Sequence, residues 1–518
     1  MEESAPLHTA EPGEQVETGL TVFDLSIHGT RTIISTLGEK DRLGIVIFAK
    51  DAKVVYELSY MNEKNKEEAL EVVKGLRTLY LTNLWDGLKL GLDMVGEAEP
   101  IPQNVQALYV LTDGAPSYGL REELLYVENL RSILQEMKAP RPLIHTFWLG
   151  LYAHSGLLQS IAEIRAERYA FIPDSGMIGT VFNHAIADHF TTFATHAKVT
   201  LHCSDSVELT QDEGSKTGIE LVEGKNKSKE GSETDMELVE VENKGKDLTM
   251  TIGTLQYGKS RNIIVRVKGA VGPNATVQAS LTYYFQRTST SIISDETLLS
   301  QAQTLPAHVC SFHEFRALIC KFLRKLYTPR SDIGHRIIGL HELAKRRAEF
   351  DNIIEDMKEA GYTDEANARL LSDLAGSKPA GHVALALSRE NFWGWGRHYL
   401  LSYLNGHTHQ VCNSFEDPGP PGHGEKESYF NRCRSELNKC FDILPTHKPL
   451  RIKKRAHDGT ITISESHSMA SYNERSTTVW NSTLVNQTMP AKRRCVRWEP
   501  TSGDKIADSL SLEPNSDL

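Results

Sequence analysis

The sequence lacks the features that mark membrane-spanning and secreted proteins. Its 518 residues contain no run of about 20 apolar residues, the length that a membrane-spanning helix requires. Residues 1–20 have no apolar stretch of the kind that forms the centre of a secretory signal peptide. The seven cysteines are odd in number, and none belongs to a Cys-x-x-Cys pair. Reduced thiols in a cytoplasmic or nuclear protein are therefore the simplest interpretation.

Sequence motifs of familiar catalytic sites are also missing. The chain contains no Gly-x-Ser-x-Gly turn, no Gly-x-x-x-x-Gly-Lys phosphate loop and no His-Glu-x-x-His zinc motif. Its formal net charge of −11 argues against general binding to nucleic acid. We therefore expect a protein that is not an enzyme, has no cofactor, and has no nucleic-acid partner and no membrane span.

The most informative feature present is an apolar run that ends in Thr-Asp-Gly. Residues 107–111 are apolar, and Thr112, Asp113 and Gly114 follow directly. This pattern predicts a strand buried on both faces, with a carboxylate at the edge of the sheet where open α/β proteins bind ligands. An Asp-Gly turn at a strand end explains Asp113 equally well. Upstream, Thr82 precedes an apolar helical pattern, which is typical of a helix N-cap.

These two segments, TNLWDGL and LTDG, resemble the von Willebrand factor A (VWA) domain. The resemblance implies a doubly wound α/β sheet with a metal-dependent adhesion site, in which Thr82 and Asp113 each give an oxygen to a divalent cation such as Mg²⁺. It also implies that a carboxylate of a partner protein completes the coordination of that ion. On this basis the expected partner-binding residues are Thr82, Asn83, Asp113 and Gly114.

The first strand of that family, with its Asp-x-Ser-x-Ser, is missing from its expected place. Residues 21–38 have the apolar spacing of a helix, and residues 1–20 contain no apolar run that could fill the centre of a sheet. Asp24, Ser26 and His28 imitate the motif, but histidine replaces its third oxygen and all three lie inside the helical pattern. A shortened gene model, an alternative start, or a degenerate domain whose sheet is repaired differently would each explain the loss.

Loss of this strand has two expected consequences. Magnesium requires about six oxygen ligands, so two residual positions leave the metal site incomplete. Removing a central strand also exposes two strand edges and leaves helices without a packing surface. We therefore expect the first domain to be marginally stable unless another segment fills the position.

Composition and periodicity predict several domains in succession: α/β, then all-β, then α-helical. The α/β part reads as an incomplete doubly wound sheet, and the strands after it alternate as in a small antiparallel β-sandwich. Both ends of the chain have the polar composition of disordered segments. The expected units are a disordered N-terminus (1–20), a truncated VWA-like domain (21–196), a β-sandwich (197–292) with a flexible insertion (213–235), a helical domain (305–445) and a disordered tail (446–518).

A second resemblance lies in the helical part. The segments WGRHYLLS and QVCNSFEDPG look like the helical region attached to VWA domains in a group of fungal proteins, some with a hedgehog/intein-type module and some with a ubiquitin-ligase U-box. Plant VWA–RING ligases share the general layout, but this chain shows no RING ligand pattern and no candidate U-box. His407, His409 and Cys412 have a spacing that a metal uses, but a structural zinc site needs four paired ligands, so we favour packing roles.

Together these features predict a non-catalytic intracellular protein-interaction or scaffold protein. It would bind a protein partner through the face around Thr82 and Asp113, with an incomplete adhesion site. The alternative is an adaptor or component of ubiquitin transfer, related to VWA-containing ubiquitin ligases.

Overall fold

The computed structural model describes most of the chain between residues 4 and 468. The described ranges are 4–7, 15–99, 101, 104–137, 141–150, 155–165, 167–172, 177–204, 208–211, 242–244, 247–268, 274–285, 289–298, 305–330, 334–376, 381–413, 428–455 and 461–468. Among these residues, no helix is both long enough and apolar enough to cross a membrane.

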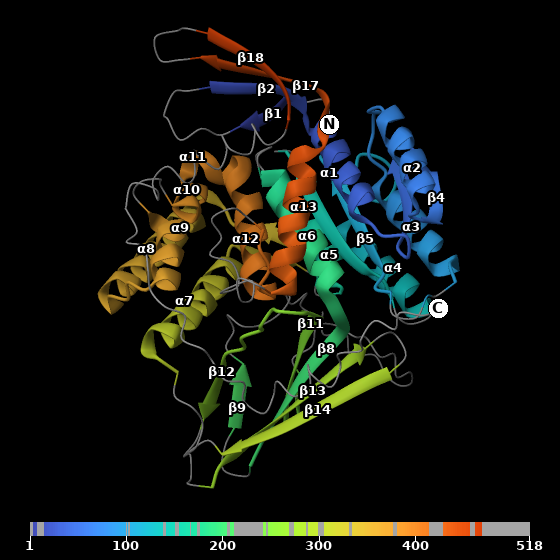
Figure 1. Cartoon of the computed structure of the whole chain (residues 1–518). Helices are drawn as coiled ribbons and strands as arrows, with labels where there is room; N and C mark the ends of the chain where they lie inside the picture. Colours follow the sequence, from blue (N-terminus) through green and yellow to red (C-terminus); the bar gives the residue numbers. More distant parts are fainter. Residues whose placement is uncertain are drawn as a thin grey trace, which may run out of the picture. The chain divides into compact units, whose positions relative to one another are not determined.

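A parallel three-stranded sheet forms the centre of the α/β region (Figure 1). Its order is β5 (Ala107–Thr112), β6 (Leu143–Leu149) and β7 (Tyr169–Ile172). All seven side chains of β6 are buried, as a continuous apolar run in a parallel sheet predicts. The accompanying helices are α4 (Glu123–Glu136), α5 (Ser155–Glu163) and α6 (Met177–Thr191). These elements confirm the predicted α/β class and the parallel arrangement.

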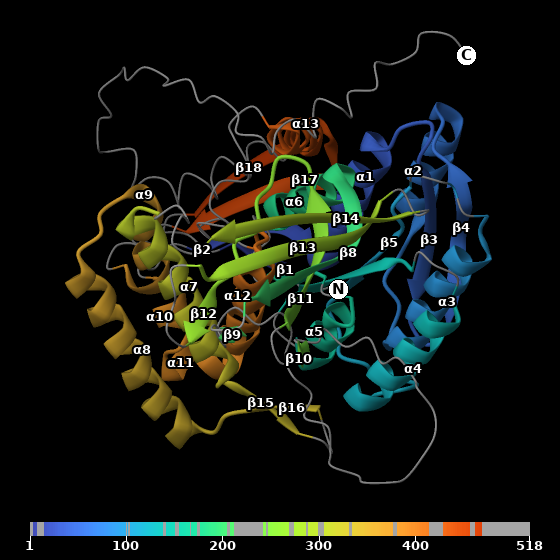
Figure 2. The ribbon, with the colours of Figure 1, turned by 90° about the horizontal axis from the view of Figure 1, so that it is seen from below.

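A separate antiparallel ribbon lies beside this sheet. It consists of β3 (Arg42–Phe48) and β4 (Ala52–Tyr60), which among the described strands pair only with each other. Figure 2 shows this pair next to β5, with α2 (Glu63–Gly75) and α3 (Leu84–Glu97) nearby. The seven residues of β3 are only half-buried, although most of them are apolar. The strand layer is therefore interrupted between β3 and β5.

Helix α1 (Val22–Thr36) begins where the sequence predicted a helix, with no strand of the central sheet before it in the described chain. Thr21 and Asp24 form a reciprocal capping box: the Asp24 N–H donates to the Thr21 hydroxyl, and the Thr21 N–H donates to the Asp24 carboxylate. This arrangement fixes the start of the helix by satisfying two otherwise unpaired donors.

The two ends of the described chain pair with each other, which differs from the disorder expected for 1–20 and 446–518. Strands β1 (Ser4–Leu7), β2 (Gln15–Thr21), β17 (Pro445–Arg455) and β18 (Ile461–Ser468) form an antiparallel sheet in the order β1-β2-β17-β18. The backbone register places Lys453 opposite Glu17. Single-segment composition gives no sign of such long-range pairing. The rest of the tail, from 469 to 518, lies outside the described residues.

Residues after α6 form antiparallel strands, as the alternating pattern predicted. A five-stranded sheet has the order β10-β11-β8-β13-β14, and β12 pairs with β9. The strands are β8 (Thr192–Cys203), β9 (Glu208–Gln211), β10 (Glu242–Lys244), β11 (Asp247–Gln256), β12 (Val265–Lys268), β13 (Thr276–Phe285) and β14 (Ser289–Leu298). A closed sandwich over 197–292 stays a prediction, and the insertion at 213–235 lies outside the described residues.

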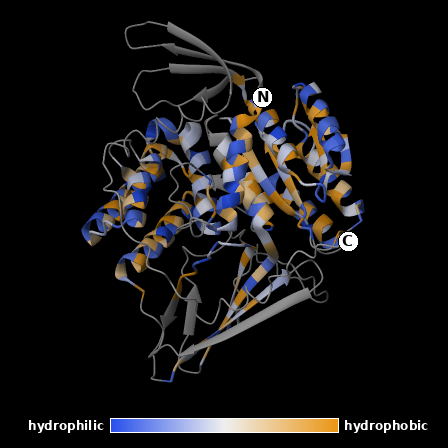
Figure 3. Cartoon of the chain, viewed as in Figure 1, coloured by the Kyte–Doolittle hydropathy of each residue, from blue (hydrophilic) through white to orange (hydrophobic). Residues whose placement is uncertain are grey.

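The C-terminal region is helical, as predicted. It contains α7 (Ala307–Arg324), α8 (Leu340–Ala360), α9 (Glu365–Ala375), α10 (His382–Ala386), α11 (Arg389–Asn391), a π-helical turn (Phe392–Gly396), α12 (Arg397–His409) and α13 (Tyr429–Ile443), with a short hairpin of β15 (Tyr327–Arg330) and β16 (Gly334–Ile337). Gly361 ends α8 in the left-handed conformation with φ of 69°. Figure 3 shows hydrophilic and hydrophobic residues alternating along α7 and α8, as expected for helices with one buried face.

The helical region closes the outer edge of the parallel sheet. The Phe171 N–H of β7 donates to the Ser402 hydroxyl at 3.0 Å, and the Tyr169 N–H donates to the Asn405 side-chain carbonyl at 3.1 Å. Both acceptors lie on α12. One hydrophobic core extends across this contact and includes Trp148, Tyr169, Phe171, Phe322, Leu400 and Tyr403. The edge of β7 is thus covered by a helix that also supplies hydrogen-bond acceptors.

Candidate functional site

Three loops meet at the carboxyl ends of β3 and β5. The first is the turn that follows β3, the second precedes α3, and the third follows β5. The Asn83 N–H donates to the Ala49 carbonyl at 2.6 Å, and the Asn83 side-chain amide donates to the Lys50 carbonyl at 3.0 Å. These bonds join the second loop to the first.

Thr82 joins the second loop to the third. Its N–H donates to the Ser117 hydroxyl at 2.9 Å, and its carbonyl accepts from the Ser117 N–H at 3.0 Å. A Cβ placed on Gly114 would lie 2.7 Å from the Thr82 hydroxyl oxygen, so a larger residue would push Thr82 away from this turn. The structure therefore brings Thr82 against the turn that contains Asp113 and Gly114. Asp113 is half-buried in this turn. The two predicted ligand positions lie in neighbouring loops.

Asn83 has a structural position rather than a partner-facing one. It is 3% exposed, and its side chain is the N-cap of α3. The Asn83 side-chain carbonyl accepts from the Asp86 N–H at 3.4 Å, and its amide donates to the Asp86 carboxylate at 2.7 Å. The expected N-cap at Thr82 is thus shifted by one residue, because asparagine is the stronger capping residue.

Two known protein families match parts of the chain. Residues 19–184 match the von Willebrand factor type A domain. The chain contains a VWA domain. Residues 364–439 match a family described as VWA / Hh protein intein-like, which corresponds to the helical region from α9 to α13. No curated protein matches the chain at a significant level.

Solved structures similar to the chain include three VWA-related or coat proteins. They are a von Willebrand factor type A protein from Catenulispora acidiphila (13% identity, 70% of this chain and 77% of that chain, TM-score 0.43), the ArnB paralog VWA2 from Sulfolobus acidocaldarius (13%, 76% and 96%, TM-score 0.37) and the human COPII-coat protein Sec24c (9%, 74% and 55%, TM-score 0.40).

Among the described residues of the domain, the predicted ligand positions do not amount to a complete divalent-cation site. Thr82 and Asp113 supply two oxygens, whereas Mg²⁺ takes about six. The residues of α1 that resemble the Asp-x-Ser-x-Ser motif have other hydrogen-bond partners. The Ser26 hydroxyl donates to the Val22 carbonyl at 3.0 Å, and His28 Nε2 lies 2.9 Å from the Phe441 carbonyl oxygen of α13. Burial lowers the pKa of His28 to about 4. The described residues contain no cluster of three or more His, Cys, Asp or Glu side chains able to hold a metal.

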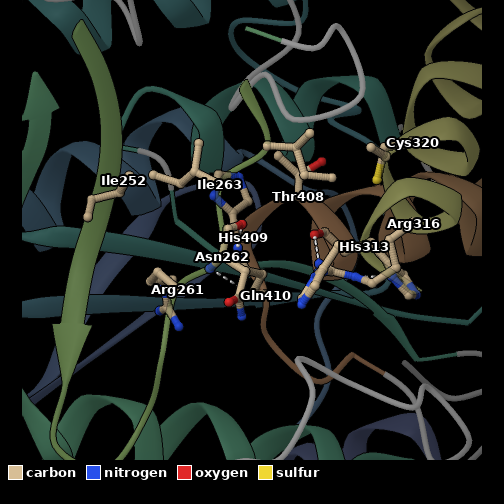
Figure 4. Close-up of a pocket in the computed structure, with 13 residues that line it drawn as sticks. Ile252, Arg261, Asn262, Ile263, His313, Arg316, Cys320, Thr408, His409 and Gln410 are labelled. Atoms are coloured by element: carbon tan, nitrogen blue, oxygen red, sulfur yellow. Dashed lines mark hydrogen bonds between the residues drawn. The ribbon is translucent and has the colours of Figure 1, made fainter. Parts of the chain in front are cut away.

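The histidines at the end of α12 also have structural partners. His409 Nε2 lies 3.1 Å from the Glu163 carboxylate, and the Arg316 guanidinium donates to His407 Nδ1 at 3.3 Å. The Cys412 carbonyl accepts from Arg168. Figure 4 shows the cavity of about 40 Å³ beside these residues, between β11 and helices α7 and α12. This volume holds a few water molecules and is too small for a cofactor.

Four large apolar side chains are exposed around the meeting point of the loops. The exposed fractions are 68% for Leu79, 87% for Tyr80, 48% for Leu81 and 42% for Tyr118. We call this set, with Thr82 and Asp113, the loop face. Sequence reasoning missed these four residues. The only available signal was the run Leu79-Tyr80-Leu81, which is too short to assign to a helix or a strand.

The backbone of the loop face is held in a strained but supported conformation. Leu81 has a φ of 73°, which a branched side chain rarely adopts. The hydrogen bonds of the neighbouring Thr82 hold this conformation in place. Such strain persists only where surrounding contacts over-determine it, and it clusters at functional sites.

A buried charge cluster lies at the amino end of β7, where three regions of the chain meet. The Asp188 carboxylate of α6 accepts hydrogen bonds from Arg168, which precedes β7, and from Lys259, which follows β11. The bond from Lys259 is 2.5 Å long. Burial acts to raise the pKa of the Asp188 carboxyl, but Lys259 and Arg168 hold it well below its usual range. Burial lowers the pKa of Lys259 to about 8. Because Arg168 also donates to the Asn413 side chain at 3.0 Å, the cluster joins the α/β, antiparallel and helical regions.

A second buried pair in the same region is Glu167 and His145, whose pKa values both shift in favour of the neutral form. Glu167 Oε2 lies 3.7 Å from His145 Nδ1, within the distance of an ion pair. Burial raises the pKa of Glu167 to about 8 and lowers the pKa of His145 to about 3. Since both groups favour their neutral forms, burial outweighs their mutual attraction. We assign the pair a structural role.

Proposed function

We propose that this protein is a non-catalytic interaction protein whose VWA domain binds a protein partner through the loop face. The observation that carries the proposal is the exposure of Tyr80 and its apolar neighbours on loops that are held in place. Soluble proteins rarely leave contiguous large apolar side chains in water unless they bind something. Tyrosines at the centre of such a patch are typical anchors of protein interfaces.

We propose that this binding does not depend on a metal ion. Thr82 and Asp113 offer two ligand oxygens. Ser26 and His28, which resemble part of the Asp-x-Ser-x-Ser motif, instead make contacts within α1 and between α1 and α13. Binding energy would then come from burial of Tyr80, Leu81 and Tyr118, with Thr82 and Asp113 giving polar contacts at the centre. Lys50 Nζ lies 5.9 Å from the centroid of the Tyr118 ring, and this cation–π contact orients the ring.

The other regions would act as a scaffold for this face. The charge cluster around Asp188 and the covered edge of β7 tie three regions together, which favours a single rigid support. A location in the cytoplasm or nucleus belongs to the same proposal and follows from the scattered, odd-numbered cysteines. A role as an adaptor in ubiquitin transfer gains no support from the described residues and stays a prediction.

Site-specific crosslinking tests this proposal. A photo-reactive amino acid replaces Tyr80 in the full chain, and the matched control carries it at Leu340, which is 52% exposed at the start of α8. We expect a protein adduct from position 80, formed equally in the presence of a metal chelator, and none from position 340. Absence of an adduct at position 80, or equal adducts at both positions, would contradict the loop face as the binding surface.

A further inference from the structure

The cavity beside α7 and α12 has a basic wall. Among the described residues that line its volume of about 40 Å³ are two arginines, Arg261 and Arg316, and three histidines, but no aspartate or glutamate (Figure 4). The Glu163 carboxylate lies 3.1 Å from Nε2 of His409, a wall residue, but Glu163 is not itself part of the wall. Buried cations in proteins are usually paired with carboxylates or with bound anions.

Arg261 gives its hydrogen bonds to neutral acceptors. Its guanidinium donates to the Gln256 side-chain carbonyl at 2.6 Å and to the Thr254 backbone carbonyl at 3.3 Å. Arg261 Nε is buried and has no hydrogen-bond partner among the described residues. Since arginine stays protonated in proteins, this residue keeps its charge and leaves one donor unused at the cavity wall.

Two carboxylates act on Arg261, those of Asp188 and Glu167. Asp188 already accepts hydrogen bonds from Arg168 and Lys259. Burial raises the pKa of Glu167 to about 8, which favours its neutral form. Three cations, Arg168, Lys259 and Arg261, therefore share the charge of one ionised carboxylate. Because an uncompensated buried charge is costly, one further anion would stabilise this region.

Arg316 adds a second guanidinium from helix α7. It is 6% exposed, and it donates to the His407 carbonyl at 2.6 Å and to His407 Nδ1 at 3.3 Å. Its Nη1 lies 3.4 Å from His313 Nδ1. Arginine can only donate, so both imidazoles accept through Nδ1 and carry their proton on Nε2. The wall thus combines fixed positive charge with neutral N–H donors.

We propose that this cavity binds a small inorganic oxyanion such as phosphate, held by the guanidinium groups of Arg261 and Arg316. Guanidinium groups match oxyanions because their N–H donors are arranged as a planar fork. A space for a few water molecules admits such an ion and excludes a nucleotide or a sugar phosphate. None of the wall residues belongs to the loop face, so this proposal does not rest on protein binding there.

Isothermal titration of inorganic phosphate into the full chain tests the proposal. The buffer contains no other oxyanion, and chloride is held constant. We expect saturable binding of one phosphate per chain, weakened at least tenfold by Arg261→Gln or Arg316→Gln. The matched control is Arg369→Gln, which removes an exposed arginine of α9 paired with Glu365 and should leave binding unchanged.

A variant of the cavity wall keeps the test decisive if an arginine variant does not fold. Ala317 of α7 is 6% exposed and lines the cavity. Ala317→Asp places a carboxylate where the anion would bind, whereas Ala317→Asn has nearly the same shape without the charge. In phosphate-free buffer the Asp variant should unfold several degrees above the Asn variant, and it should not bind phosphate.

Three outcomes would overturn the proposal. The first is the absence of saturable phosphate binding to the wild-type chain. The second is phosphate binding that both arginine variants retain unchanged, or a stabilisation by phosphate that chloride reproduces at equal ionic strength. The third is an Ala317→Asp variant that is less stable than Ala317→Asn, because a carboxylate in a cavity without excess positive charge costs free energy.

Discussion

The buried charge cluster makes a sharp prediction about stability. Asp188 is 7% exposed and accepts hydrogen bonds from Arg168 and Lys259. Asp188→Asn keeps the shape of the side chain but removes the charge that both cations need. Breaking a buried ion pair by removing one partner costs about 3–5 kcal/mol, because the other charge stays buried without compensation.

The pH dependence of this loss follows from Lys259. Burial lowers the pKa of Lys259 to about 8, and Asp188 opposes that shift. A lysine with a lowered pKa destabilises the folded state while it is protonated, and this cost disappears as pH rises from the folded pKa to the ordinary value. Without Asp188 the pKa of Lys259 should fall further. The stability loss of Asp188→Asn should therefore be larger at pH 6 than at pH 9.

The assay is thermal unfolding of the full chain at both pH values. A loss of 3–5 kcal/mol corresponds to a fall of about 5–15 °C in the first unfolding transition. The matched control is Asp351→Asn, which removes an exposed partner of Arg347 on α8 and should change the transition by no more than about 2 °C. If Asp188→Asn is no more destabilising than Asp351→Asn, the cluster does not tie the three regions together.

Two further predictions concern buried positions. Burial raises the pKa of Glu167 to about 8, so its contribution to stability is fully present below the ordinary carboxyl pKa and is lost as pH rises to about 8. Glu167→Gln should therefore match the wild type in unfolding temperature at pH 5 and exceed it at pH 9. Equal unfolding temperatures at pH 9 would contradict a buried, neutral Glu167. A Cβ on Gly396 would lie 2.2 Å from the Ala386 carbonyl oxygen, whereas one on Gly394 would meet nothing within 4 Å. Gly396→Ala should lower the unfolding temperature by several degrees and Gly394→Ala should leave it unchanged; similar effects of the two would show that the helices around the π-helical turn are not packed this closely.

Much of the α/β order was predictable from the sequence because each strand is a local apolar run. The run from Ala107 to Leu111 and the turn at Asp113 identified both the strand and its carboxyl edge. Gly361 likewise marked the end of α8. The lack of an apolar run before residue 21 predicted that a strand of the sheet would be missing, and the described sheet is interrupted between β3 and β5.

The features that the sequence did not reveal depend on contacts between distant segments. Strands β2 and β17 pair across most of the chain, and neither is apolar enough to be recognised alone. Arg168, Asp188 and Lys259 look like surface charges until the fold brings them together in the interior. The exposure of Tyr80 is a property of the folded loop, since a tyrosine between two leucines is more often buried.

The central claim is that the loop face binds a protein without a metal ion. The most direct test is the affinity of the full chain for the partner recovered by crosslinking. It is compared with that of the double variant Tyr80→Ala/Tyr118→Ala and with that of Tyr429→Ala, which removes a 50% exposed tyrosine of α13. We predict at least a tenfold weaker affinity for the double variant, since two interface anchors typically contribute more than about 1.4 kcal/mol together. Tyr429→Ala and added chelator should change nothing. Unchanged affinity of the double variant, or loss of binding in chelator alone, would contradict the account.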